Sequence, residues 1–301
     1  MRGSTASSAS DSASDSASTS ASTSASTSNA RGSGQVPPLL ELRSLMKRFA
    51  DPREGERTVV ADFDLDVRPG EFCALIGPTG CGKSTVLSMI AGLERPSSGT
   101  ILADGVELTG TDPRTGFVFQ NDAVFPWKTV LGNIAAGPRF RGAGKHEAND
   151  QALDWIRRVG LAGFERHYPH QLSGGMRKRV ALAQTFVNHP RVLLMDEPFS
   201  GLDAQTRQIM AGELLALWET LGASVLFVTH DLEEAIGLAD RVVVLTARPA
   251  TVKQEFTVDL PRPRSPREIR FHPRFVELHE EIWSTLSDEV RVAYARATTV
   301  S

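Results

Sequence analysis

Apolar and polar positions along residues 36–260 follow patterns that predict strands joined by helices. Residues 39–42 and 59–67 alternate between the two classes, which is typical of strands with one buried face. Nearly continuous apolar runs are typical of strands buried on both faces, and they occur at 71–76, 116–119, 192–195, 224–228 and 242–245. Because helical patterns separate many of these runs, we expect an α/β fold with a largely parallel sheet covered on both faces.

Helical spacing of apolar residues is clearest in two regions. Helical patterns dominate from about 121 to 188, for example at 151–159 and 176–187. Near the C-terminus Pro273 can open a helix, because its missing N–H is not needed in the first turn. We expect this C-terminal helix to pack on the domain before it. The apolar residues at helical spacing are Phe275, Leu278, Ile282, Leu286 and Val290.

Composition divides the chain into three parts. Residues 1–35 are mostly Ser, Ala and Thr, with too few large apolar groups to offset the entropy lost on ordering, so we predict a disordered tail. Residues 36–260 have the composition of a globular domain. Residues 261–301 combine a linker rich in Pro and Arg with the C-terminal amphipathic helix. We expect the linker arginines to be solvated, and they are Arg262, Arg264, Arg267 and Arg270.

The composition of the whole chain argues against several functions. Of the 301 residues, 41% are hydrophobic and 23% are charged, which suits a protein that buries a core in water. A net charge of −3 provides no basic field for nucleic acid. No apolar run approaches the roughly 18–20 residues that span a bilayer, so we expect the chain to stay in the cytoplasm. Cys73 and Cys81 lack the spacing of a metal site.

A glycine-rich loop follows the apolar run at 71–76 and precedes a helix expected at 86–93. Its sequence fits the pattern G-x-x-x-x-G-K-[ST]. Glycines let successive backbone N–H groups turn toward phosphate oxygens, and the following helix directs its positive end to the same place. Lys83 can reach the outer phosphates, and the Ser84 hydroxyl can ligate Mg²⁺. The candidate nucleotide-binding residues are Gly77, Pro78, Thr79, Gly80, Cys81, Gly82, Lys83, Ser84 and Thr85.

Two carboxylates follow the apolar run at 192–195. Ligands bind at the carboxyl ends of strands in open α/β sheets, so we expect Asp196 and Glu197 to lie beside the glycine-rich loop. Asp196 suits the ligand shell of Mg²⁺, and Glu197 suits a general base that acts on water. The loop and the acidic pair together predict an enzyme that binds and hydrolyses a nucleoside triphosphate.

The segment Leu172-Ser-Gly-Gly-Met176 places a second anion-binding helix start on the same chain. One nucleotide does not need two phosphate sites from a single chain. We therefore expect Ser173, Gly174 and Gly175 to close over the nucleotide of a neighbouring copy in a head-to-tail pair. The alternative is a Gly-Gly helix entry that binds no ligand.

The order of these motifs resembles the ATPase domain of ABC transporters over about residues 39–250. The resemblance implies the fold of a P-loop NTPase, with a mostly parallel sheet core, an antiparallel β subdomain and a helical subdomain at about 121–188. The domain itself would span 36–260. Its ligands would be ATP and Mg²⁺.

The same resemblance implies roles for four further residues. Gln120 would link Mg²⁺ and the attacking water to the surface that contacts the membrane protein. His230, in Val228-Thr-His-Asp231, would contact the γ-phosphate. Asp203, in Ser200-Gly-Leu-Asp203, would communicate between the two copies. Phe49 would stack on adenine, a contact worth roughly 1–3 kcal/mol.

Three segments narrow the resemblance to the ATPases of nitrate, sulfonate and taurine importers. They are Gln120-Asn-Asp-Ala-Val-Phe-Pro-Trp127 with Thr129-Val130, the LSGG sequence followed by Met176, and Val258-Asp-Leu-Pro-Arg-Pro-Arg264. Met176 stands where the family most often has glutamine, and Gly201 where alanine is more usual. Neither change removes a residue of the expected phosphate sites.

The resemblance implies uptake of a small solute, for example nitrate, a sulfonate or taurine, driven by ATP hydrolysis. Two copies of the chain would form a homodimer beneath two membrane permease subunits, peripheral to the cytoplasmic face of the plasma membrane. A solute-binding protein outside the membrane would supply the solute. The surface near Gln120 and residues 125–127 would touch a permease helix, although Trp127 could instead pack in the core.

Two other functions are weighed against transport. An ATPase of the same superfamily that acts on nucleic acid would need a long coiled coil or zinc modules between the motifs, and the stretch from Ser84 to Leu172 is too short for either. A non-catalytic scaffold would not need the complete set of residues suited to hydrolysis, which are Lys83, Asp196, Glu197 and His230. We therefore expect no nucleic-acid partner.

Overall fold

The computed structural model describes residues 37–51 and 55–299. The tail at 1–35, for which the sequence predicts disorder, lies outside these residues. The helices and strands all belong to one unit, which comprises residues 36–301.

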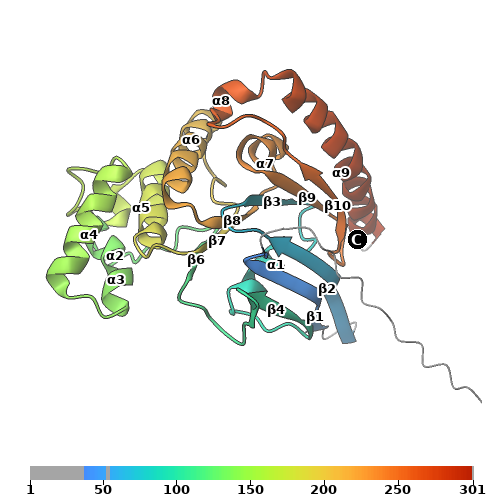
Figure 1. The fold of residues 1–301 in the computed structure, drawn as a ribbon, viewed down its shortest axis with the longest axis horizontal. Helices are drawn as coiled ribbons and strands as arrows, with labels where there is room; N and C mark the ends of the chain where they lie inside the picture. The colour runs from blue at the N-terminus through green and yellow to red at the C-terminus, as the bar shows by residue number, and fades with distance from the viewer. Residues whose placement is uncertain (1–36, 52–54, 300–301) are drawn as a thin grey trace, which may run out of the picture. The chain divides into compact units, whose positions relative to one another are not determined.

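A largely parallel sheet forms the centre of this unit, with the strand order β10-β9-β3-β8-β7-β6 (Figure 1). β3 lies between β8 and β9 and is parallel to both, and β7 is parallel to β8 and β6. β10, at the edge, is antiparallel to β9. The strands are β3 (Phe72–Ile76), β6 (Thr115–Val118), β7 (Val192–Asp196), β8 (Ser224–Val228), β9 (Arg241–Leu245) and β10 (Val252–Thr257).

Both faces of the central sheet are covered, which explains its continuous apolar strands. Successive side chains of a strand point to opposite faces. Phe72, Ala74 and Ile76 accordingly belong to a core shared with most of the helices. Cys73 and Leu75 belong to a second core, shared with α1 (Lys83–Ile90) and the antiparallel sheet.

The antiparallel sheet has the strand order β2-β1-β4-β5. β1 pairs with β2 on one side and with β4 on the other. The four strands of this sheet are β1 (Leu40–Asp51), β2 (Gly55–Val67), β4 (Ser98–Ala103) and β5 (Val106–Glu107). β1 and β2 extend well beyond the alternating segments at 39–42 and 59–67 that predicted them, because the two strands continue to pair with each other.

One group of helices lies apart from those that cover the central sheet, at the left of Figure 1. This group comprises α2 (Val130–Ile134), α3 (Ala136–Phe140), α4 (Lys145–Arg158) and α5 (Gly174–Phe186), with a short 3₁₀ turn at Pro169–Gln171. The helices α6 (Ala204–Leu221) and α7 (Leu232–Leu238) connect β7, β8 and β9. The parallel core, antiparallel sheet and helical group confirm the predicted fold class.

The C-terminal segment packs more closely on the domain than its composition indicates. α8 (Pro266–Ile269) lies within the stretch interpreted as a linker, and α9 (Pro273–Thr299) follows it. Of the five apolar residues at helical spacing, α9 buries the first four, whereas Val290 is 40% exposed. The buried residues of α9 are Phe275, Leu278, Ile282 and Leu286.

The expectation that the linker arginines are solvated is wrong for Arg264. This side chain is buried, and its guanidinium donates hydrogen bonds to the carbonyls of Val258 and Leu260, both at 3.1 Å, and to the carbonyl of Ala239. Burial lowers the pKa of Arg264 to about 10, and the charge of Arg262 acts in the same direction. Three backbone carbonyls from two segments of the chain compensate for the lost hydration.

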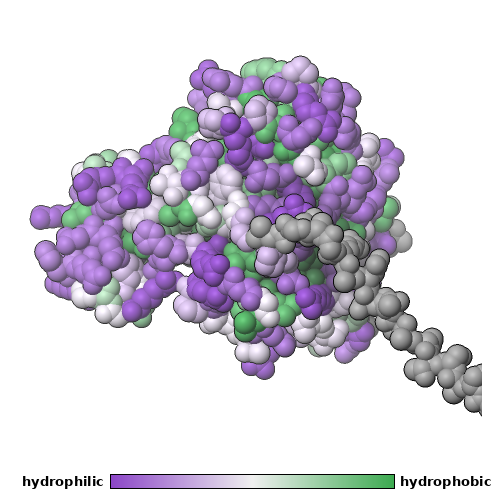
Figure 2. Space-filling view, viewed as in Figure 1, coloured by the Kyte–Doolittle hydropathy of each residue, from purple (hydrophilic) through white to green (hydrophobic). Residues whose placement is uncertain are grey.

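Within residues 37–51 and 55–299, no helix combines the length and apolar content needed to cross a membrane. On the face drawn in Figure 2, hydrophilic residues surround scattered apolar ones, and the surface of the helical group at the left is mostly hydrophilic. Single exposed apolar residues of this kind are usual on protein surfaces.

Phe227 of β8 provides a test of the core. It is fully buried, and its ring packs against Phe72 and Phe199 at centroid distances of 5.7 and 5.9 Å. Phe227→Ala should lower the free energy of unfolding by about 3–5 kcal/mol, measured by urea titration, because it leaves a cavity between sheet and helices. Phe140→Ala, at a site that is 78% exposed, is the control and should change it by less than about 0.5 kcal/mol. Equal losses would contradict this description of the core.

Candidate functional site

The glycine-rich loop joins β3 to α1, as the sequence predicts. Gly80 and Gly82 have φ angles of 74° and 131°, which favour glycine. A Cβ on Gly82 would lie 3.0 Å from the carbonyl oxygen of Val59, so the loop also needs glycine for its close approach to β2. The positive-φ glycines and the start of α1 together give the geometry of an anion-binding loop.

Lys83 lies buried at the start of α1. Its ammonium donates hydrogen bonds to the carbonyl oxygens of Gly77 at 2.8 Å and Pro78 at 3.0 Å. Both partners are neutral, and among the described residues no carboxylate lies within ion-pair distance of the ammonium. The charge of Lys83 therefore remains available to an anion in the loop.

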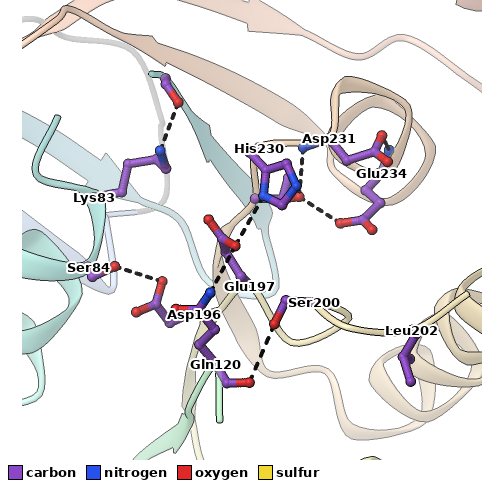
Figure 3. Close-up of polar contacts among 12 residues, drawn as sticks. Lys83, Ser84, Gln120, Asp196, Glu197, Ser200, Leu202, His230, Asp231 and Glu234 are labelled. Atoms are coloured by element: carbon purple, nitrogen blue, oxygen red, sulfur yellow. Dashed lines mark hydrogen bonds and ion pairs between the residues drawn. The ribbon is translucent and has the colours of Figure 1, made fainter. Parts of the chain in front are cut away.

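Asp196, at the end of β7, meets the loop directly. Its Oδ1 accepts a hydrogen bond of 3.0 Å from the hydroxyl of Ser84 (Figure 3). Burial raises the pKa of Asp196 despite this hydrogen bond, and the charge of Glu197 adds to the effect. A carboxylate whose charged form is disfavoured in this way gains from a nearby cation. A hydroxyl and a carboxylate oxygen are ligands that Mg²⁺ prefers, so the pair fits this ion.

Glu197 connects the two other predicted hydrolytic residues. Its Oε2 accepts a hydrogen bond of 3.3 Å from Nε2 of Gln120 and lies 3.1 Å from Nδ1 of His230 (Figure 3). The backbone of Glu197 has φ = 44°, a left-handed conformation that is uncommon for residues other than glycine. Strain of this kind often occurs at functional sites.

The loop lines one cavity of about 470 Å³, and Asp196 lies behind Ser84 without lining it. His230, Glu197 and Gln120 lie at this cavity together with the loop, although they follow three different strands. Val59 and Arg248, which the sequence did not indicate as site residues, also line it. The remaining lining residues are Thr79, Gly80, Gly82, Lys83, Ser84 and Thr85.

A network on α6 and α7 holds the segment around His230. Thr229 donates a hydrogen bond of 2.7 Å to Glu234, and its oxygen accepts the backbone N–H of Asp231 at 3.0 Å. Arg207 of α6 pairs with Asp231 at 3.0 Å and with Glu234 at 3.6 Å. Burial raises the pKa of Glu234 from 4.5 to about 7.

The backbone at Gln120 is tied to the helical group. Its carbonyl oxygen accepts a hydrogen bond of 2.6 Å from Lys178 of α5 and one of 3.5 Å from the Ser200 hydroxyl. Lys178 also pairs with Asp122 at 3.2 Å. Displacement of α5 would therefore move the segment that carries Gln120.

Several predicted site residues do not line this cavity. Ser173 is exposed and caps α5, accepting a hydrogen bond of 3.3 Å from the N–H of Met176. Asp203 similarly caps α6, accepting the N–H groups of Gln205 and Thr206. Gly174 and Gly175 lie in the first turn of α5. Phe49, 38% exposed on β1, lies under the ammonium of Lys47, 4.7 Å from the ring centroid.

An apolar groove of about 420 Å³ lies between β6 and the helical group. Phe119, Phe125 and Phe140 line it, and Phe140 is 78% exposed. Buried Asn133 shapes the adjoining loop by bonding the N–H of Phe125 at 2.6 Å and the carbonyls of residues 125, 128 and 129. Trp127, on this loop, is 72% exposed, so the alternative that it packs in the core is wrong.

Comparison with known proteins places this geometry in a family. A family model described as ABC transporter matches residues 60–200. An uncharacterised ABC transporter ATP-binding protein of Methanocaldococcus jannaschii is 46% identical over 252 residues, which are 83% of this chain and 92% of that protein. A solved dimeric ATP-binding cassette in a post-hydrolysis state, bound to ADP and Pi, has a TM-score of 0.66 and 31% identity, with 74% of this chain and all of the other covered.

Two further relatives have named import functions. The nitrate import ATP-binding protein NrtD of Synechocystis sp. is 42% identical over 252 residues, 82% of this chain and 94% of that protein. The taurine import ATP-binding protein TauB of Burkholderia thailandensis is 42% identical over 231 residues, 75% of this chain and 89% of that protein.

Fold, site and relatives together define an enzyme that hydrolyses ATP. The chain belongs to the ABC transporter family, as an ATP-binding subunit. The predicted resemblance to nitrate and taurine importer ATPases is confirmed.

The raised pKa of Glu234 predicts a pH dependence of stability. The folded protein binds this proton more tightly than the unfolded chain, so its contribution to stability is complete below pH 4.5 and is lost as pH rises to about 7. Glu234→Gln has no charge to bury. The difference in melting temperature between this variant and the unmodified protein should therefore increase in favour of the variant as the pH rises from 5 to 8. Glu233→Gln, at the exposed neighbouring position, is the matched control. A melting-temperature difference for Glu234→Gln that is constant across this range would contradict the raised pKa.

Proposed function

We propose that this chain powers the uptake of a small anion, of the nitrate, sulfonate or taurine type, through a separate membrane permease. The observation that carries the proposal is that one chain combines a cavity lined by Lys83, Glu197 and His230 with an exposed helix start at Ser173, which lies outside that cavity. The named functions of the relatives favour import and this class of solute.

The residues around the cavity have complementary roles in this proposal. Lys83 and the N–H groups of the glycine-rich loop bind the phosphates of ATP. Ser84, Asp196 and Gln120 hold Mg²⁺, which supplies positive charge to the phosphate oxygens. Glu197 accepts a proton from the attacking water, and His230 donates a hydrogen bond toward the γ-phosphate.

A second copy of the chain completes each site. Ser173, Gly174 and Gly175 are accessible at the start of α5, where a helix N-terminus attracts phosphate. A head-to-tail homodimer would bring these residues of one copy to the nucleotide of the other. Asp203 then lies near the contact between copies, and Phe49 stacks on adenine. The dimeric structure of the solved relative supports this arrangement.

The apolar groove between β6 and the helical group is the proposed docking site for a permease helix. It adjoins Gln120, whose backbone is bonded to Lys178 of α5. A partner helix seated there would couple movement of α5 to the hydrolytic site. The chain would then work peripherally at the cytoplasmic face of the plasma membrane, with a solute-binding protein on the opposite side and no contact with nucleic acid.

Replacing Glu197 tests the roles assigned within the site. Glu197→Gln keeps the size of the side chain but cannot accept the proton, so ATP turnover should fall by about 10²–10⁴-fold. ATP binding should persist, and the variant should accumulate as a dimer with ATP, measured by light scattering in size-exclusion chromatography. Asp288→Asn, which removes an exposed carboxylate on α9, is the control. Near-normal turnover by Glu197→Gln would refute the general-base role.

Recovery of the tagged chain from gently solubilised membranes tests the transport function. Mass spectrometry should identify a multi-span permease, and genes for a binding protein encoded with it would point to the solute. Phe140→Glu should reduce permease recovery at least tenfold, because it puts a charge into the apolar groove. Trp283→Glu, at an exposed apolar position on α9, should not. Recovery with nucleic acid instead of a permease would refute transport.

A further inference from the structure

Arg248 occupies a place at the ATP site that the hydrolytic residues do not explain. It follows β9 and lines the same cavity as Lys83 and Thr85. One guanidinium NH₂ donates a hydrogen bond of 2.8 Å to the carbonyl oxygen of Gly80. The Nε atom is buried and has no hydrogen-bond partner. The side chain is thus positioned against the loop while part of its donor capacity is unused.

The order of the strands shows which side of the loop Arg248 occupies. β3 carries the loop and lies between β8 and β9. The residues that act on the attacking water follow β6, β7 and β8, all on one side of β3. Arg248 follows β9, on the other side. It therefore reaches the cavity from the flank of the loop opposite to Glu197 and His230.

That flank adjoins the sheet that carries Phe49. The N–H of Ala250 donates a hydrogen bond of 2.8 Å to the carbonyl of Val59 on β2. The carbonyl of Ala250 accepts one of 3.1 Å from the N–H of Ala61 on the same strand. Phe49 on β1 lies opposite Arg57 on β2. Arg248 is thus close to both the phosphate loop and the strands that hold the proposed adenine platform.

The positive charge of Arg248 has no carboxylate partner in the part of the chain that the structure describes. None of the ion pairs among residues 37–51 and 55–299 involves it. Burial lowers the pKa of Arg248, and the positive charge of Arg57 acts in the same direction. A guanidinium that lines the cavity and forms no ion pair with the described carboxylates favours an anionic ligand group there.

The C-terminal helix holds the segment that presents Arg248. Glu289 of α9 accepts the N–H of Ala247 at 2.7 Å and pairs with Lys253 of β10 at 2.8 Å. Arg296 of α9 donates a hydrogen bond to the carbonyl oxygen of Arg248 itself. Figure 1 shows α9 running beside β10. The backbone on both sides of the Arg248 side chain is thus fixed by a helix outside the site.

We infer that Arg248 binds the ribose and α-phosphate part of the nucleotide, and that α9 positions it through Glu289. ATP and ADP share this part, whereas they differ at the γ-phosphate. Arg248 is thus a determinant of nucleotide affinity, and α9 is a structural element through which affinity can be changed from outside the cavity.

Calorimetric titrations in a Glu197→Gln background test this inference without turnover. Arg248→Ala should raise the dissociation constants of Mg-ATP and Mg-ADP by a similar factor of roughly ten, the loss expected for a charge-assisted hydrogen bond. Arg291→Ala, which removes an exposed arginine of α9, is the charge-matched control. Unchanged affinity for both nucleotides would overturn the inference, as would weaker binding of ATP alone, which would place the contact at the γ-phosphate.

Inorganic pyrophosphate separates nucleotide contact from a purely structural role. If Arg248 only braced the loop through Gly80, its removal would weaken pyrophosphate and ADP equally, and the inference would fall. If Arg248 contacts the ribose and α-phosphate, Arg248→Ala should weaken the binding of ADP more than the binding of pyrophosphate. In kinetics with otherwise unmodified protein, Arg248→Ala should raise KM for ATP more than it lowers kcat, and Arg248→Lys should recover part of the loss.

A double-mutant cycle tests the role of α9. Glu289→Ala should raise the dissociation constant of ADP by a smaller factor than Arg248→Ala. In the Arg248→Ala background it should have little further effect, because Glu289 would act through Arg248. If Glu289→Ala raised the dissociation constant of ADP by the same factor with and without Arg248, the positioning role of Glu289 would be overturned. Comparable melting temperatures of the single variants would show that the affinity changes do not reflect unfolding.

Discussion

The parallel pairing of β3 with β8 on one side and β9 on the other is the constraint on which the site depends. It brings the ends of three strands together, so the glycine-rich loop, His230 and Arg248 meet around one cavity although they lie far apart in the chain. The close approach of Gly82 to Val59 then fixes the antiparallel sheet against the loop. Substrate binding and hydrolysis thus share one backbone framework.

The same framework gives the ATP site two separate mechanical connections. On the hydrolytic side, the carbonyl of Gln120 is bonded to Lys178 and thereby to the helical group. On the other side, the segment that carries Arg248 is bonded to α9. Two helices distant from each other in the chain, α5 and α9, are therefore bonded to the backbone around the same cavity.

Local sequence patterns were sufficient for the buried strands and for the loop between β3 and α1. They did not reveal β4, β5, β10, α6 or α7. α6 illustrates the reason, since its apolar residues are not confined to one stripe and Ile209 is 58% exposed. Arg264 and Arg248 were missed for another reason. Their environments come from carbonyls and loops that only the tertiary fold brings near, and no local spacing encodes them.

The left-handed backbone of Glu197 has a consequence for how the protein can be improved or damaged. A residue other than glycine in this conformation costs about 1–3 kcal/mol of stability, which glycine would recover. Among the described residues this conformation also occurs at Ser44, Asp62, Asp104 and His189, but of the five only Glu197 lines the cavity. With the general-base role proposed for Glu197, selection for thermal stability at this residue would act against turnover, whereas the other four positions carry no such conflict.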